Sequence, residues 1–219
     1  MTKKPSLSQR IERLRRLRYY GEFNYALLSG GHYDEGSIIR KFYHKKRFQK
    51  IIKELDLKKD GIIADVGCGS GNILSYLNTG HRQLIGLDLY MNFLRYAKAK
   101  VPDGHFIRCD ANCPPIKNQA CDLVISTEVL EHLENPGLAI KELARISKDK
   151  IFVAIPDERS AIFKVIWTIW CFIHKHEWGH VSILAPEEIR RILTKHEFTV
   201  EKQLNWYKML ILIKARKIL

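Results

Sequence analysis

Residues 62–71 of the chain read IIADVGCGSG, and this stretch decides the fold. Its first half is a short apolar run, typical of a strand buried in a sheet. Its second half holds three glycines spaced two apart, Gly67, Gly69 and Gly71, before a helical pattern begins at Asn72. Glycine permits positive φ and close approach of the backbone to a ligand, and the N–H groups at the start of a helix attract anions. The loop therefore predicts a site for a ligand with a nucleoside and an anionic group.

The glycine spacing separates this loop from two better-known phosphate-binding loops. The dinucleotide fingerprint GxGxxG, read from Gly67, requires a third glycine where the chain has Asn72. A P-loop requires Gly-Lys-Ser/Thr, which is missing from this segment. The pattern is instead Asp-x-Gly-x-Gly-x-Gly from Asp65. A tight strand-to-helix turn without a ligand is the alternative for the loop taken alone.

Strand-like and helix-like segments alternate on the C-terminal side of the loop. Short β-branched runs occur at 61–67, 83–89, 105–110, 121–127 and 151–156. Helical patterns lie between and after them, at 72–77, 92–100, 136–147 and 186–195. Such alternation predicts βαβ units and a parallel sheet. Residues 198–217 read as two strands with a bend at Asn205, which predicts a closing antiparallel hairpin.

Polar residues stand at the ends of the next three strands. Asp88 ends the second strand, 17 residues after Gly71. Asp110 ends the third, and Ser126 and Glu128 end the fourth. Each carboxylate alone could be a helix N-cap. In doubly wound folds, the carboxyl ends of the parallel strands line the crevice that binds the ligand. These polar residues and the glycine loop all follow such strand ends, which favours a nucleoside site with Asp88 accepting from the ribose hydroxyls.

These motifs make the chain resemble class I S-adenosylmethionine (SAM)-dependent methyltransferases, in the broad group that includes ubiquinone-pathway and sugar- or lipid-pathway enzymes. The resemblance is carried by residues 65–71, by LIGLDL at 84–89, by FIRCDA at 106–111, by CDLVISTEVLEHL at 121–133 and by HVSILAPEEIRRIL at 180–193. It covers about residues 38–215. It implies an α/β, three-layer, Rossmann-like fold whose seven-stranded sheet is mostly parallel and ends in an antiparallel hairpin.

The resemblance also implies which residues hold SAM. All of them lie on or directly after the first four strands: Asp65, Gly67, Cys68, Gly69, Gly71, Asp88, Leu89, Asp110, Ala111 and Ser126. By similarity, the three glycines approach the methionine part of SAM, and Asp88 holds the ribose. Asp110 accepts a hydrogen bond from the adenine amino group, with Ala111 beside it. The backbone near Ser126 faces the amino group of SAM.

An acceptor oxygen must lose a proton during methyl transfer, through a general base or a metal. Glu128, Glu131 and His132 offer two carboxylates and an imidazole that could hold a divalent ion, with His176 or His180 as a further ligand. Their spacing is similar to that of magnesium-dependent O-methyltransferases, so Mg²⁺ is one candidate cofactor. In metal-free relatives a similar run orders the loop. Without a metal, His132 or His180 is the candidate catalytic base, because neutral imidazole suits proton transfer near pH 7.

Residues 161–178, AIFKVIWTIWCFIHKHEW, are apolar on nearly every side of a helix. A helix of this kind is buried, lies at an interface or enters lipid. It could cover an apolar acceptor such as a polyprenyl, quinone or lipid-linked sugar, form a dimer face, or pack on the sheet edge. Lys164, His174, Lys175 and His176 favour an anionic or membrane-bound acceptor.

Composition bounds the remaining properties of the 219-residue chain. Its net charge is +13, and residues 1–60 carry 16 Lys or Arg against 7 Asp or Glu. This asymmetry indicates either an anionic partner or a solvated basic helix. Five cysteines without a CxxC pair argue against a secreted disulfide framework, and the N-terminus lacks a signal-peptide pattern. We therefore expect a cytoplasmic protein, with contact to a membrane surface left open.

The sequence predicts one domain, residues 1–219. Within it, residues 1–55 form basic N-terminal helices that act as a lid, 61–157 the SAM-binding core, 158–182 an acceptor or lid insert, and 183–219 the last helix and strands. The expected activity is O-methylation of an amphiphilic or apolar small molecule of the quinone, lipid or lipid-linked sugar class. An RNA methyltransferase that uses the basic N-terminal region, and a SAM-binding regulator without catalysis, are the alternatives.

Overall fold

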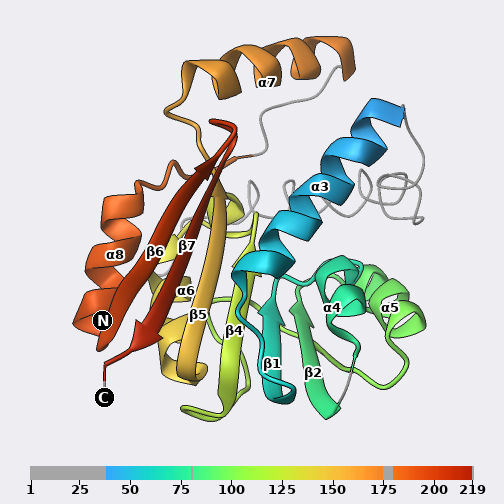
Figure 1. The fold of residues 1–219 in the computed structure, drawn as a ribbon, viewed down its shortest axis with the longest axis vertical. Helices are drawn as coiled ribbons and strands as arrows, with labels where there is room; N and C mark the ends of the chain where they lie inside the picture. Colours follow the sequence, from blue (N-terminus) through green and yellow to red (C-terminus); the bar gives the residue numbers. More distant parts are fainter. Residues whose placement is uncertain (1–37, 80, 175–179, 219) are drawn as a thin grey trace, which may run out of the picture. The chain divides into compact units, whose positions relative to one another are not determined.

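The computed structural model describes residues 38–79, 81–174 and 180–218. It divides into two compact units, Met1–Phe48 and Gln49–Leu219, and helix α3 (Ile38–Glu54) contains the boundary. The second unit contains the whole sheet (Figure 1). Most of the basic N-terminal segment, including the proposed lid helix, lies outside the described residues, as does His176.

Seven strands form one sheet in the order β3-β2-β1-β4-β5-β7-β6 (Figure 1). The strands are β1 (Asp60–Val66), β2 (His81–Asp88), β3 (His105–Arg108), β4 (Cys121–Thr127), β5 (Ser147–Pro156), β6 (Phe198–Trp206) and β7 (Leu210–Lys217). Neighbours among the first five strands are parallel, whereas β7 pairs antiparallel with both β5 and β6. The predicted Rossmann-like sheet and its C-terminal hairpin are confirmed.

Six helices follow α3 in the described residues, and four of them form two packed pairs. They are α4 (Asn72–Leu77), α5 (Met91–Lys100), the short 3-10 helix η1 (Leu130–His132), α6 (Pro136–Ile146), α7 (Ala161–His174) and α8 (Pro186–Lys195). Helices α4 and α5 pack together against β2 and β3, while α6 and α8 pack together against β4 to β7. Pro136 and Pro186 occupy first-turn positions, where the missing N–H has no helical partner to lose.

The hairpin turn differs from its predicted place. Asn205 lies inside β6 opposite Ile211, and its side-chain amide donates to the Asp157 carboxylate. The chain turns instead at Tyr207 and Lys208, both of which adopt positive φ (54° and 58°). Two central residues with positive φ match the twist of a tight hairpin, a geometry that usually selects Asn or Gly. The predicted bend at Asn205 is wrong because Tyr207 and Lys208, which form the turn, are not residue types that signal one.

Helix α7 follows β5 through the turn at residues 157–160. Phe163 on this helix is buried, but several aliphatic side chains of the same helix are exposed. Among the described residues, no helix is both long and apolar enough to cross a membrane.

Candidate active site

The glycine loop connects β1 to α4, and each of its glycines has positive φ. A Cβ at Gly67 would lie 2.2 Å from Val129 Cγ2, and one at Gly71 would lie 2.8 Å from Ala97 Cβ. Close packing therefore requires glycine at both positions. A Cβ at Gly69 would have no heavy atom within 4 Å. The loop thus leaves open space at Gly69, where a bound molecule can approach the backbone.

Asp88 ties the glycine loop to the end of β2. One oxygen of its carboxylate accepts from the Gly69 N–H and the other from the Tyr90 N–H, both at 2.9 Å. Burial raises the pKa of Asp88 despite these backbone hydrogen bonds. These contacts fix the carboxylate at the C-terminal end of the sheet, beside the loop, as the sequence predicted.

Asp65 is a second buried carboxyl at this end of the sheet. Burial, and to a lesser extent the charge of Asp88, raises the pKa of Asp65 to about 7. Its Oδ1 atom is buried without a hydrogen-bond partner among the described residues, and so is Ser126 Oγ at the end of β4. Buried polar atoms are nearly always satisfied in native proteins. The two atoms fit a site completed by a polar ligand such as SAM.

The remaining predicted cofactor residues come shortly after β1, β2 and β3 in the chain. Cys68 is buried, and its thiol donates to the Gly69 carbonyl. Leu89 is exposed at the end of β2. Asp110 accepts from the Asn112 N–H at 2.9 Å, which orders the turn containing Ala111. The C-terminal ends of adjacent parallel strands thus carry the whole predicted SAM set.

Residues 128–132, which follow β4, contain the 3-10 helix η1 and are held by backbone hydrogen bonds to residues distant in the chain. Glu128 has a φ of 55°, rare for a residue other than glycine, and its N–H donates to the Ala154 carbonyl at 2.8 Å. The Glu131 carbonyl accepts from the Val181 and Ser182 N–H groups at 2.8 and 3.1 Å. These contacts bring the segment after α7 against η1.

His132 and His180, the two predicted catalytic candidates, come together here. Their ring centroids are 5.0 Å apart, and His180 stacks on Trp167 at 5.2 Å. His180 Nδ1 is hydrogen-bonded to a Glu158 carboxylate oxygen, and both side chains are almost completely buried. Glu158 is not among the residues predicted from the sequence. Its signal was the acidic pair Asp157-Glu158 after the fifth strand, the same polar strand-end pattern found after the other strands.

Glu131, His132 and His180 also form a candidate metal centre. Ligand atoms of Glu131, His132 and His180 all lie within 4.8 Å of one another. Glu128 is not part of this group, although it was one of the metal candidates. Two imidazoles and one carboxylate suit Zn²⁺, Mn²⁺ or Fe²⁺ better than Mg²⁺, which prefers oxygen ligands.

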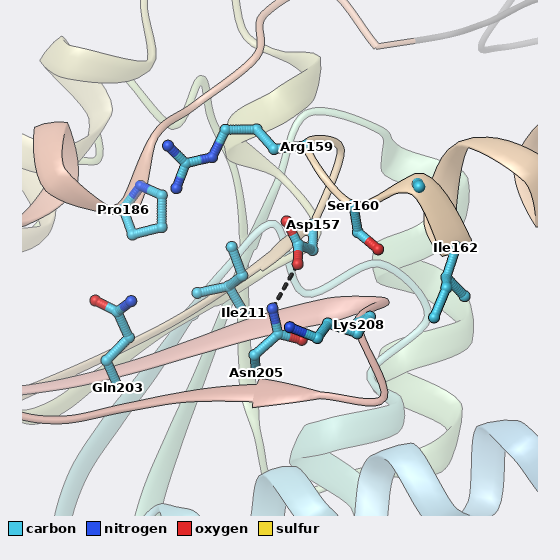
Figure 2. A pocket seen from close by; sticks show the side chains of 10 residues that line it. Asp157, Arg159, Ser160, Ile162, Pro186, Gln203, Asn205, Lys208 and Ile211 are labelled. Atoms are coloured by element: carbon cyan, nitrogen blue, oxygen red, sulfur yellow. Dashed lines mark hydrogen bonds between the residues drawn. The ribbon is translucent and has the colours of Figure 1, made fainter.

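A separate hollow of about 480 Å³ lies where the 157–160 turn, the start of α7 and the β6–β7 hairpin meet (Figure 2). Asp157, Arg159, Ile162 and Lys208 are among its lining residues. None of its lining residues belongs to the glycine loop or to the histidine pair. It is therefore distinct from the predicted SAM site.

Comparison with known proteins identifies the class. A family described as a methyltransferase domain matches residues 64–155. The chain is 25% identical over 203 residues to a ubiquinone/menaquinone biosynthesis C-methyltransferase of Campylobacter jejuni (81% of this chain, 85% of the relative). It is 23% identical over 170 residues to a ubiquinone biosynthesis O-methyltransferase of Bradyrhizobium diazoefficiens (72% and 66%). Its fold is similar to that of magnesium protoporphyrin IX methyltransferase from Synechocystis PCC 6803 with bound SAH, with a TM-score of 0.73, 18% identity and coverage of 94% and 99%.

The glycine loop, the strand-end carboxylates and these similarities together make the chain a class I SAM-dependent methyltransferase. Its distant relatives in that class include the two quinone-pathway enzymes named above.

Proposed function

We propose that this protein transfers the methyl group of SAM to an oxygen of an amphiphilic or apolar small molecule of the quinone, lipid or lipid-linked sugar class. The observation that carries the proposal is the buried Glu158–His180 pair, enclosed on one side by aromatic rings of α7. A base held in an apolar, enclosed place suits deprotonation of an acceptor hydroxyl. The attacking atom differs between the two named quinone-pathway relatives, which are a C- and an O-methyltransferase.

The hydrogen bond to Glu158 defines the role of His180. When His180 Nδ1 donates its proton to Glu158, Nε2 is left as the acceptor for a hydroxyl proton. As the proton moves to Nε2, the buried carboxylate stabilises the imidazolium that forms, as in other carboxylate–histidine pairs. SAM, when bound, supplies a methyl group already activated on a positively charged sulfur, so positioning provides much of the rate.

The surroundings of the pair favour an apolar acceptor. Phe163 is buried, and its ring stacks with Trp167 at 5.7 Å, so the two rings form a continuous aromatic wall beside His180. Small-molecule sites typically combine such apolar walls with few polar groups. The Glu158–His180 pair supplies the polar group, and the wall supplies contact area for a ring or a hydrocarbon tail.

A transfer assay with radiolabelled SAM tests the proposal on the full chain. We expect label in the hydroxyl-bearing acceptors of a panel, with a phenol that carries a prenyl tail preferred over the same phenol without it by about tenfold, because the tail adds buried apolar area. Mass spectrometry of the product distinguishes an O-methyl ether from a C-methyl group. Label found in RNA and in none of the small molecules would contradict the proposal and favour the RNA alternative.

The same assay separates base catalysis from metal catalysis. After dialysis against EDTA we expect activity to remain within about twofold, since a His180 oriented by Glu158 can accept the proton without a metal. Loss of activity that Zn²⁺ or Mn²⁺ restores in the wild type, but not in Glu131→Gln, would assign the metal centre instead. Manganese binding followed by electron paramagnetic resonance gives a readout independent of turnover.

A further inference from the structure

The outer face of α7 carries an exposed aliphatic stripe. Ile162, Val165, Ile166 and Ile169 are spaced three and four residues apart, so they share one side of the helix. Their side chains are 51%, 58%, 48% and 54% exposed. Phe163 and Trp167 point to the other side, where they stack near His180. Contiguous exposed aliphatic patches mark interaction sites on soluble domains.

The length of α7 limits what this stripe can do in a membrane. The helix has 14 residues, which gives about 21 Å at about 1.5 Å per residue. A span needs about 20 apolar residues. A helix of this kind instead lies in the plane of the lipid interface, with one face among the acyl chains.

Two cations line the hollow at the N-terminal end of the stripe. Ile162, its first residue, lines the hollow that also contains Arg159 and Lys208 (Figure 2). Arg159 pairs with Glu187 at 3.3 Å, but both side chains are more than half exposed, and such pairs are weak. Lys208 forms no ion pair with any residue that the structure describes. Positive charge next to an apolar helix face is complementary to an anionic lipid surface.

We propose that the outer face of α7 docks on a membrane that contains anionic lipids, with Arg159 and Lys208 against the headgroup phosphates. A second copy of the chain would present the same cations at this face, whereas lipid phosphates complement them. Docking itself does not depend on the proposed function. Given that function, α7 separates the bilayer from His180 by the width of one helix, so an amphiphilic acceptor would reach the site from the lipid.

Flotation of the full chain with vesicles tests this surface without SAM or acceptor. We expect binding to phosphatidylcholine vesicles containing about 30% phosphatidylglycerol, at least about tenfold weaker binding to pure phosphatidylcholine, and similar weakening in about 0.5 M NaCl. The double variant Val165→Asp/Ile169→Asp should lose at least about tenfold in vesicle affinity. Lys208→Glu should weaken binding to the anionic vesicles only.

Leu138→Asp is the matched control, because Leu138 is an exposed aliphatic residue (39%) of another helix, α6. It should bind vesicles like the wild type. SAM titration calorimetry on each variant shows that the fold is retained, and separates failure of docking from failure of the cofactor site. A wild type that binds neither vesicle would overturn the proposal. So would a wild-type dimer in sedimentation that the double variant converts to monomer without any vesicle binding.

Discussion

Replacing His180 with alanine is expected to lower kcat by about 10²–10⁴-fold, the usual contribution of a positioned acid–base group. The affinity for SAM should stay within about threefold, because the imidazole is oriented by Glu158, which is not among the predicted SAM-binding residues. Single-turnover transfer from radiolabelled SAM measures the first quantity, and calorimetric titration the second.

Two further variants test whether a lower kcat in His180→Ala reflects the loss of the base. Glu158→Gln keeps the size of the side chain but removes the charge that stabilises the imidazolium, so it should lower kcat and alter the pH profile with little change in KM. His196→Ala, at the exposed end of α8, is the control and should behave like the wild type. If His180→Ala retains full kcat, His180 is not the base, and His132 becomes the remaining candidate.

Replacing Asp88 with alanine is expected to weaken SAM binding by about 100-fold, or about 3 kcal/mol. The carboxylate oxygens stand beside the open space at Gly69, where they can accept from ribose hydroxyls. The variant also loses the acceptor of the Gly69 N–H, so the loop becomes less ordered before binding. Calorimetric titration with SAM and with S-adenosylhomocysteine measures the effect, and both ligands should weaken together because they share the ribose.

A surface aspartate provides the comparison for Asp88. Asp149, near the start of β5, pairs with Lys58 at 3.3 Å at the other end of the parallel strands. Asp149→Ala should leave SAM affinity unchanged, since exposed ion pairs contribute little even to stability. Equal affinity in Asp88→Ala and the wild type, with an unchanged circular dichroism spectrum, would remove Asp88 from the ribose site.

The sequence was most informative where one local pattern determines the structure. The run at 121–127 is continuous and β-branched, and β4 has those bounds. The three glycines predicted a loop with positive φ, which the structure has, and packing against Val129 and Ala97 leaves no room for a Cβ at two of them. Such features depend on residues close in the chain, which makes them readable from a single sequence.

The Glu158–His180 pair was harder to foresee because its two residues are far apart in the chain. Glu158 and His180 are 22 residues apart and meet only because α7 leaves the sheet and the chain returns to η1. Periodicity carries no information on such a return. Helix α7 shows the same limit. The sequence places apolar residues on nearly every side of this helix, and only the structure shows that Phe163 is buried while Val165 is exposed.

The antiparallel position of β7 has a consequence for the order in which the protein can be made. Strand β7 covers β5 along seven paired residues, from Lys150 with Arg216 to Pro156 with Leu210. During synthesis, β5 leaves the ribosome about 60 residues before this partner, and its edge is unpaired for that interval. Unpaired apolar strand edges invite association with other chains. The parallel strands can pair as the chain emerges, but the free edge of β5, the strand that leads to Glu158, is fully paired only after translation has passed residue 217.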